Sequence, residues 1–265
     1  MAKEQLRVFK IGGKVVEDSD QLSTFLQAFS KLAENKILIH GGGKWVSEMC
    51  QKLGIVVNMV DGRRITDAET LEVVKMMLAG VANKNVVSKL QGFGCNAIGM
   101  TGADGNTIQA SKRPLKNGID YGFVGDVKKV DHQVIQKLID AGLVPVFASM
   151  THDGAGNLFN TNADTIASSL ATGMAKEFDV ELNYCFELNG VLKNIDDPES
   201  VITEINPSNY SILKEEGTIN SGMIPKIDNA FDALDSGVRA VRIMNSQHIK
   251  RLAEGEKEVG TLIMN

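Results

Sequence analysis

The chain has 265 residues, of which 43% are hydrophobic and 23% charged, the ordinary balance of a globular protein with a sizeable core. Its net charge of −5 excludes a general affinity for nucleic acid, because a phosphate backbone attracts basic surfaces. No window approaches the roughly 18 apolar residues of a membrane span, and the three widely spaced cysteines form neither a metal motif nor a disulfide framework. We therefore expect a cytoplasmic protein that binds neither nucleic acid nor a membrane.

Apolar strands and amphipathic helices alternate along the first part of the chain. The elements expected there are a strand at 6–11, a helix at 19–33, a strand at 37–40, a helix ending near 53, an extended segment at 55–60, helices at 66–78 and 81–90 separated at Gly80, and a strand at 96–101. Asp61-Gly62 is a turn signal that predicts a hairpin after the extended segment. Thr66 is expected to cap the next helix, with Glu69 completing a capping box.

The second part of the chain repeats this alternation after residues 102–130, which are rich in Gly, Asp, Asn and Pro and are expected to form surface hairpins. The elements expected beyond them are a helix at 132–141, a strand at 143–148, a helix at 163–176 capped by Asn162 or Thr161, a strand at 180–186, helices near 208–215 and at 226–236, a strand at 239–244, a short helix near 247–253 and a last strand around 259–263. This pattern predicts an α/β fold with a mainly parallel sheet covered on both faces. We expect a single domain over 1–265, with an N-lobe at 1–178 and a C-lobe at 179–265.

Glycine-rich turns follow two of the apolar strands. One strand leads through His40 into Gly41-Gly42-Gly43 and then into a helix, and the first strand ends in Lys10-Ile11-Gly12-Gly13. This layout brings bare backbone N–H groups and a helix N-terminus up to an anion. Two such turns predict a site that binds a polyanion from two sides. The alternative is that the glycine triplet only makes a tight strand-to-helix turn.

Two lysines stand next to glycine. Lys10 lies inside an otherwise apolar strand, where its charge is costly unless an anion or a carboxylate meets it. The alternative for Lys10 is an edge position from which the ammonium reaches water. Lys226 follows Ser221-Gly222-Met-Ile-Pro225 at the start of a helix, where phosphate is also favoured, although a plain surface lysine would give the same pattern.

Amides, a carboxylate and arginines are the other polar groups that stand out. Asn160-Thr-Asn162-Ala-Asp164 places two amides and a carboxylate at a helix start, and capping explains only one of the three. Arg63-Arg64 follows the Asp-Gly turn, and a guanidinium binds a carboxylate bidentately. The four histidines are scattered, so no metal site is predicted, and we interpret His40 as a packed strand-end residue and not as a base.

The order of these motifs resembles the amino acid kinase family, in the branch that phosphorylates N-acylated glutamate. The motifs are Lys10-Ile-Gly-Gly13, His40-Gly-Gly-Gly43, Gly62-Arg-Arg64-Ile-Thr66, Asn160-Thr-Asn162-Ala-Asp164 and Gly222-Met-Ile-Pro-Lys226, and the match covers nearly the whole chain. The resemblance implies an open three-layer αβα sandwich whose mainly parallel sheet has about eight strands. It also implies ATP-dependent phosphorylation of the side-chain carboxylate of N-acetyl-L-glutamate in arginine biosynthesis, with Mg²⁺ held mainly by the phosphates of ATP.

Residue roles follow from the resemblance position by position. The catalytic residues would be Lys10, Lys226 and Asp164, with Asp164 holding both lysines in place. The residues that bind phosphate or ATP would be Gly12, Gly13, Gly42, Asn189 and Gly190. The residues that bind the acylamino acid would be Gly42, Gly43, Arg64 and Asn160, of which the last two meet its α-carboxylate. A glutamate carboxylate, with an ordinary pKa of about 4.3, is ionised at neutral pH, so the reaction needs no general base.

Several alternatives stay open at this point. The family's usual Thr/Ser-Asp-Val-x-Gly run in the nucleotide lobe reads Phe186-Glu187-Leu188-Asn189-Gly190 here. The stretch Tyr121–Asp126 leaves the acyl group open, so N-succinyl-L-glutamate is an alternative substrate. A non-catalytic sensor that binds ATP or an acylamino acid is the alternative outside the enzymes. Lys10 and Lys226 argue against it, because a sensor has no need of two cations that stabilise a transition state. The chain starts at its first strand, without the extra N-terminal helix of arginine-inhibited members, which predicts a homodimer without arginine feedback.

Overall fold

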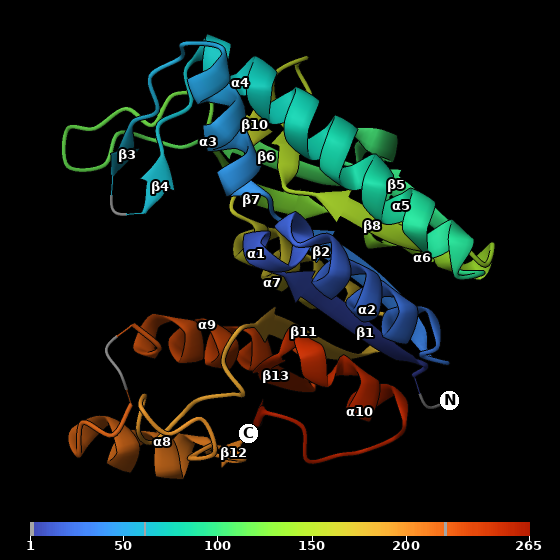
Figure 1. The fold of residues 1–265 in the computed structure, drawn as a ribbon, viewed down its shortest axis with the longest axis vertical. Helices are drawn as coiled ribbons and strands as arrows, with labels where there is room; N and C mark the ends of the chain where they lie inside the picture. The colour runs from blue at the N-terminus through green and yellow to red at the C-terminus, as the bar shows by residue number, and fades with distance from the viewer. Residues whose placement is uncertain (1–2, 61, 220–221) are drawn as a thin grey trace.

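A large sheet runs through the centre of the molecule (Figure 1). The computed structural model describes residues 3–60, 62–219 and 222–265, and within them this sheet has eight strands in the order β12-β14-β13-β11-β1-β2-β8-β5. The strands are β1 (Gln5–Ile11), β2 (Asn35–His40), β5 (Ala97–Met100), β8 (Val144–Ala148), β11 (Asp179–Phe186), β12 (Glu204–Ile205), β13 (Ala240–Asn245) and β14 (Thr261–Ile263). Neighbouring strands are parallel except for the antiparallel pair β13 and β14. The prediction of a mainly parallel sheet is confirmed.

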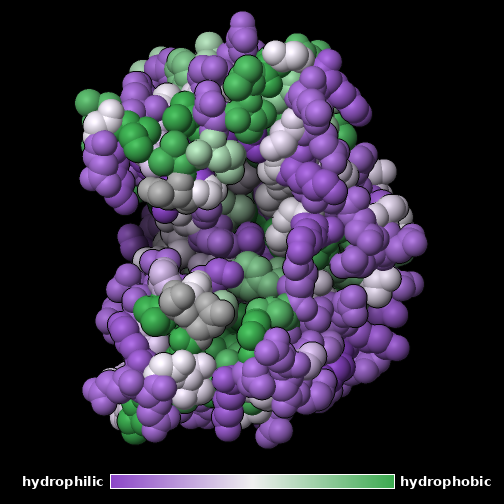
Figure 2. Space-filling model, turned by 60° about the vertical axis from the view of Figure 1, so that its left-hand side comes forward, coloured by the Kyte–Doolittle hydropathy of each residue, from purple (hydrophilic) through white to green (hydrophobic). Residues whose placement is uncertain are grey.

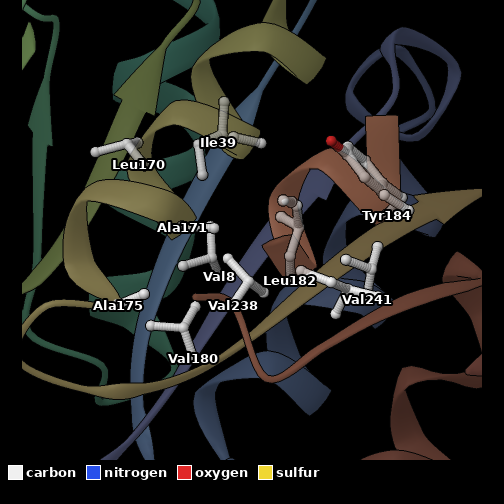
Figure 3. Packing of buried hydrophobic residues seen from close by; sticks show 14 of the residues in the cluster. Val8, Ile39, Leu170, Ala171, Ala175, Val180, Leu182, Tyr184, Val238 and Val241 are labelled. Carbon is white, nitrogen blue, oxygen red and sulfur yellow. The ribbon is translucent and has the colours of Figure 1, made fainter. Parts of the chain in front are cut away.

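Helices cover both faces of this sheet. One face packs against α6 (His132–Asp140), α7 (Ala163–Met174), α8 (Pro207–Glu215) and α9 (Ile224–Asp235), and the other against α1 (Gly13–Glu17), α2 (Ser19–Ser30), α5 (Asn83–Gly92) and α10 (Ile249–Ala253). Side chains alternate along β1, so Val8 joins the first core and Phe9 the second. Figure 3 shows part of the first core, to which Val8, Leu182 of β11 and Ala171 of α7 contribute. The three-layer αβα sandwich is confirmed.

A second, smaller sheet lies past the carboxyl ends of β8 and β5 and has the order β10-β9-β6-β7 (Figure 1). Its strands are β6 (Ile108–Lys112), β7 (Gly125–Val130), β9 (Met150–His152) and β10 (Leu158–Asn160). The antiparallel pair β6 and β7 confirms a hairpin within 102–130. Strands β9 and β10 are not predicted from the sequence, because a three-residue strand is too short to show an alternating pattern.

The hairpin expected after the extended segment is present as β3 (Met59–Val60) and β4 (Arg63–Arg64), in which Val60 pairs with Arg63. Asp61 lies outside the described residues, as does Ser221 of the motif that ends in Lys226. The capping box at Thr66 is wrong. Asp67 caps α4 (Ala68–Val74), its carboxylate accepting from the Thr70 N–H at 2.8 Å. Thr66 is unavailable because its own N–H and C=O bond the backbone of Tyr121 and Phe123.

The predicted break at Gly80 is also wrong. The chain stays helical from α4 through a π-helical stretch, Lys75–Ala82, into α5. A single glycine costs a helix only about 1 kcal/mol, and buried residues on both sides of Gly80 offset that cost. The π-helical stretch carries Leu78 to the glycine triplet, as described below. No helix in the described part of the chain is long and apolar enough to cross a membrane.

Candidate active site

The molecule is hollowed on one side, above the carboxyl ends of β1 and β2 (Figure 2). The first cavity, with a volume of about 250 Å³, is lined by six of the predicted site residues, namely Lys10, Gly13, Gly42, Gly43, Arg64 and Asn160. The second cavity, also of about 250 Å³, is lined by Gly12, Gly13, Gly190 and Lys226, together with Lys14, Phe186 and Glu187. Gly13 belongs to both linings, so the two cavities meet at the first glycine turn.

The two glycine turns lie side by side because β1 and β2 are neighbours in register, with Ile11 opposite His40. A Cβ atom on Gly13 would come within 3.9 Å of the Gly42 backbone nitrogen. Gly42 itself has φ +146°, and a Cβ atom there would lie 2.9 Å from Leu78 Cδ2. Only glycine fits this position, which is the N-cap of α3 (Gly43–Lys52) and makes no side-chain cap hydrogen bond. The Glu17 carboxylate accepts from the N–H groups of Lys44 and Trp45 in the first turn of α3, so the N–H groups of Gly42 and Gly43 are those left for an anion in the first cavity.

Lys10 is buried and forms an ion pair with Asp164. The pleat of β1 turns Lys10 to the α7 side of the sheet, and its Nζ lies 2.9 Å from Asp164 Oδ1 in the first turn of α7. The Lys10 side chain is 9% exposed and that of Asp164 38%. The interpretation that a carboxylate meets the charge of Lys10 fits this geometry, and the edge position is excluded because β1 has strands on both sides.

Lys226 approaches the same place from the first turn of α9 and is half-buried. Its Nζ lies 3.9 Å from the centre of the Phe186 ring, and the Lys10 Nζ lies 4.9 Å from the same centre. Burial lowers the pKa of Lys226, the charge of Asp164 raises it, and Lys10 lowers it. Among the ion pairs of the described residues, none joins Lys226 to Asp164. Asp164 thus contacts one lysine directly and acts on the other through its field.

Arg64 reaches from β4 to the start of α3. Its Nη2 donates to the Gly43 carbonyl and to Ser47 Oγ, both at 2.8 Å. Its Nη1 is buried with no hydrogen-bond partner among the described residues, and burial lowers the pKa of the guanidinium. A buried, unpartnered N–H donor in a cavity wall favours a ligand oxygen there.

The three polar residues before and in α7 have separate tasks. Asn160 donates from Nδ2 to Thr66 Oγ1 at 3.1 Å and lines the first cavity. Asn162 caps α7, accepting from the N–H groups of Asp164 and Thr165, which decides between the two expected caps. Asp164 pairs with Lys10. Capping therefore accounts for one residue of the three, as the sequence indicates.

Asn189 and Gly190 take different places at the second cavity. The Asn189 amide donates to the Pro198 carbonyl at 3.0 Å and accepts from Asn245 at 3.1 Å, so its side chain secures the loop after β11. Gly190 lines the cavity, and a Cβ atom there would lie 2.7 Å from Thr261 Oγ1. No group of three His, Cys, Asp or Glu side chains that could hold a metal ion is found within residues 3–60, 62–219 and 222–265.

His40 is fully buried at the end of β2, and burial lowers its pKa to about 4. Asn83 donates from Nδ2 to His40 Nε2 at 3.2 Å, which leaves Nδ1 to donate to the Gly41 carbonyl at 2.9 Å. The neutral imidazole thus fixes the backbone in front of the glycine triplet. This confirms the interpretation of His40 as a packed residue.

Sequence reasoning missed two residues of the site. Arg113 lines the first cavity and is bound by Asp126 through its Nε and Nη2, at 3.0 and 2.6 Å. Nothing in the local sequence marks it, because only the pairing of β6 with β7 brings these residues together. Phe186 had a signal, its departure from the family pattern, but its contact with two lysines depends on the positions of β1, β11 and α9.

The profile of the amino acid kinase family matches residues 5–245. The chain belongs to the amino acid kinase family. It is 53% identical to the acetylglutamate kinase of Cytophaga hutchinsonii over 261 residues, 98% of this chain and 99% of the relative. It is 51% identical to the acetylglutamate kinase of Bacteroides fragilis over 241 residues, 91% of this chain and 92% of the relative.

Among solved structures, smu.665 of Streptococcus mutans is similar in fold to this amino acid kinase family member, with a TM-score of 0.74 and 26% identity. The match covers 98% of each chain. The fold implied by the sequence motifs is therefore shared along nearly the whole length, including the strands that carry the glycine turns.

Proposed function

We propose that this protein transfers the γ-phosphoryl group of ATP to the side-chain carboxylate of N-acetyl-L-glutamate, a step of arginine biosynthesis. The observation that carries the proposal is a pair of lysines that line two adjoining cavities, Lys10 the first and Lys226 the second. The acetylglutamate kinases to which the chain is similar over nearly their full length support this substrate.

The reaction requires two anions to approach each other. An oxygen of the substrate carboxylate forms a bond to the γ-phosphorus, the bond from that phosphorus to the bridging oxygen breaks, and ADP leaves with the electron pair. No proton is transferred, since the carboxylate is ionised at neutral pH. Lys10 and Lys226, with the N–H groups of the two glycine turns, would stabilise the charge on the transferring phosphoryl group.

The first cavity would hold the acylamino acid. The Nη1 of Arg64, which has no partner among the described residues, and the polar side chain of Asn160 would bind its α-carboxylate, and Gly42 and Gly43 would offer backbone N–H groups. Two carboxylates on one small ligand match a cavity whose charged lining residues are Lys10, Arg63, Arg64 and Arg113. This charge pattern is the reason to prefer an acylated glutamate to a neutral substrate.

The second cavity would hold the phosphates of ATP, against Gly12, Gly13, Gly190 and Lys226. Mg²⁺ bound to the phosphates would neutralise part of their charge, and we propose that the phosphates are its main ligands. Residues of the expected N-lobe, 1–178, line the first cavity, and residues of the expected C-lobe, 179–265, line much of the second. This supports an N-lobe that binds the acylamino acid and a C-lobe that binds the nucleotide.

We further propose that the protein acts in the cytoplasm as a homodimer. Met76 and Val81, on the continuous helix between α4 and α5, are 50% and 45% exposed although apolar, which supports an interface on that helix. Light scattering on the purified chain would give a dimer mass, and charged substitutions at both positions would give a monomer. A monomeric wild type would contradict this proposal.

The reaction is tested by ATP turnover with N-acetyl-L-glutamate, N-succinyl-L-glutamate, free L-glutamate and carbamate in parallel, with hydroxylamine to trap any acyl phosphate. We expect a hydroxamate with the acetylated substrate and none with free glutamate. A product only with the succinylated substrate would change the acyl group and keep the reaction. If no hydroxamate forms with any of the four substrates while the protein still binds ATP, the result would favour a non-catalytic sensor.

A further inference from the structure

The ring of Phe186 contacts both lysines of the site. It ends β11, and its ring centre lies 3.9 Å from Lys226 Nζ and 4.9 Å from Lys10 Nζ. The ring also stacks on Tyr184, with the ring centres 6.0 Å apart and the planes 13° from parallel. The Tyr184 hydroxyl donates to the Asp164 carbonyl at 3.4 Å. Through Tyr184, the ring is therefore linked to α7, the helix that carries Asp164.

The two lysines differ in what balances their charge. Lys10 has the Asp164 carboxylate at 2.9 Å, whereas no carboxylate among the described residues pairs with Lys226. The aromatic face attracts the Lys226 ammonium through its quadrupole. A carboxylate partner would cancel the positive charge of Lys226, but an aromatic ring has no net charge and leaves it available to an incoming phosphate.

We propose that Phe186 is a positioning residue for phosphoryl transfer, holding the Lys226 ammonium in the wall of the second cavity without an ion pair to Asp164. This rests on the proposed kinase activity. The ring does its work without contacting the reacting atoms, by keeping one of the two cations in place and fully charged. A competing role, a platform on which adenine stacks, is less favoured because Tyr184 and both ammonium groups already contact the ring.

The test is the steady-state kinetics of Phe186→Leu, which removes the π-face and keeps an apolar side chain. We expect kcat to fall by roughly 5- to 30-fold, the loss of one partly desolvated cation–π contact, with the KM values for both substrates nearly unchanged. Phe186→Tyr, which retains the ring face, should restore most of kcat. Phe231→Leu is the matched control, since Phe231 is a half-buried aromatic on α9 that packs on Tyr210, and it should leave kcat unchanged.

A double-mutant comparison separates positioning from general structural support. In a Lys226→Met background, Phe186→Leu should reduce kcat much less, because the closer of the two cation contacts is gone and only that of Lys10, at 4.9 Å, remains. An undiminished loss in that background would overturn the proposal. So would a raised KM for ATP with kcat unchanged, which is the signature of adenine stacking.

A measurement independent of turnover keeps this proposal apart from the proposed function. In the protein with ¹³C-labelled lysine, the ε-CH₂ signal of Lys226, assigned through Lys226→Arg, should be shifted upfield by the ring current of Phe186. The shift should vanish in Phe186→Leu and persist in Phe231→Leu. An unshifted signal would overturn the inference about Phe186, whereas a wild type inactive on every substrate would overturn the kinase activity itself.

Discussion

Replacing Lys10 with methionine removes one positive charge from the site and keeps a side chain of similar length. The Lys10 Nζ lies 2.9 Å from Asp164 Oδ1, so the variant leaves the Asp164 carboxylate without its partner. Because the Asp164 side chain is 38% exposed, water can solvate it, and the free energy of unfolding should fall by only about 1 kcal/mol. For a chain of 265 residues that loss lowers Tm by about 2 °C.

The effect on catalysis should be far larger. Losing one preorganised electrostatic stabiliser of a transition state typically costs about 3 to 4 kcal/mol, which corresponds to a loss of roughly 100- to 1,000-fold in kcat. The assay is acyl phosphate formation trapped with hydroxylamine, at saturating ATP and N-acetyl-L-glutamate. The KM for the acylamino acid should change much less than kcat, because Lys10 is expected to act on the transferring phosphoryl group.

Lys36 provides a matched control, since Lys10 and Lys36 are equally buried and lie on the neighbouring strands β1 and β2. The Lys36 Nζ donates to the carbonyls of Ser30 and Leu32, away from both cavities. Lys36→Met should lower Tm and leave kcat unchanged. If Lys10→Met kept kcat within about tenfold of the wild type while remaining folded, the assignment of Lys10 as a transition-state stabiliser would be refuted.

Three further predictions follow from the same geometry. Arg64→Ala should raise the KM for N-acetyl-L-glutamate by roughly 10- to 100-fold, the loss expected for one charge-assisted hydrogen-bond pair, with little change in kcat. Initial rates measured over a range of N-acetyl-L-glutamate concentrations test this, and a lower kcat with an unchanged KM would contradict the role assigned to Arg64. Burial lowers the pKa of Lys226 below its ordinary 10.5, so kcat should fall as the pH rises through that pKa. Lys226→Arg should move this fall in kcat to higher pH. If the fall stays at the same pH in the variant, another group is responsible for it. His40 has a folded-state pKa of about 4 against an ordinary 6.5, so its contribution to the free energy of unfolding is complete above pH 6.5 and is lost as the pH falls towards 4. Chemical denaturation at a series of pH values should show a loss of about 3 kcal/mol over this range. His40→Gln should make the free energy of unfolding less dependent on pH here, and an equal dependence in the variant would exclude His40 as its source.

Local sequence patterns determined most of the elements and much of the site. Apolar periodicity predicts β1, β2, α2 and α7, because side-chain spacing within one segment fixes which face is buried. The glycine turn at Gly42 is likewise visible in a few neighbouring residues, whereas the local pattern left the cap of α7 open between Thr161 and Asn162. The sequence by itself also indicated the family, since several motifs in a fixed order along the whole chain are far more specific than any one of them.

Long-range contacts corrected the local predictions wherever the two competed. Thr66 is lost as a cap because its backbone pairs with Tyr121 and Phe123, and Gly80 stays helical because the packing on either side of it outweighs its weak helix preference. Both errors concern groups whose partners are remote in sequence. A local pattern carries no information about such partners.

Tertiary structure alone decided how the site is assembled. The register of β1 against β2 and β11 brings Lys10 to Asp164 and beside Phe186, and α9 carries Lys226 to the same ring. Pairing of β6 with β7 places Arg113 in the cavity wall. The sequence determined which charges and glycines are present, whereas strand pairing and helix packing fixed the distances between them, because electrostatic stabilisation depends on separation and on the surrounding dielectric.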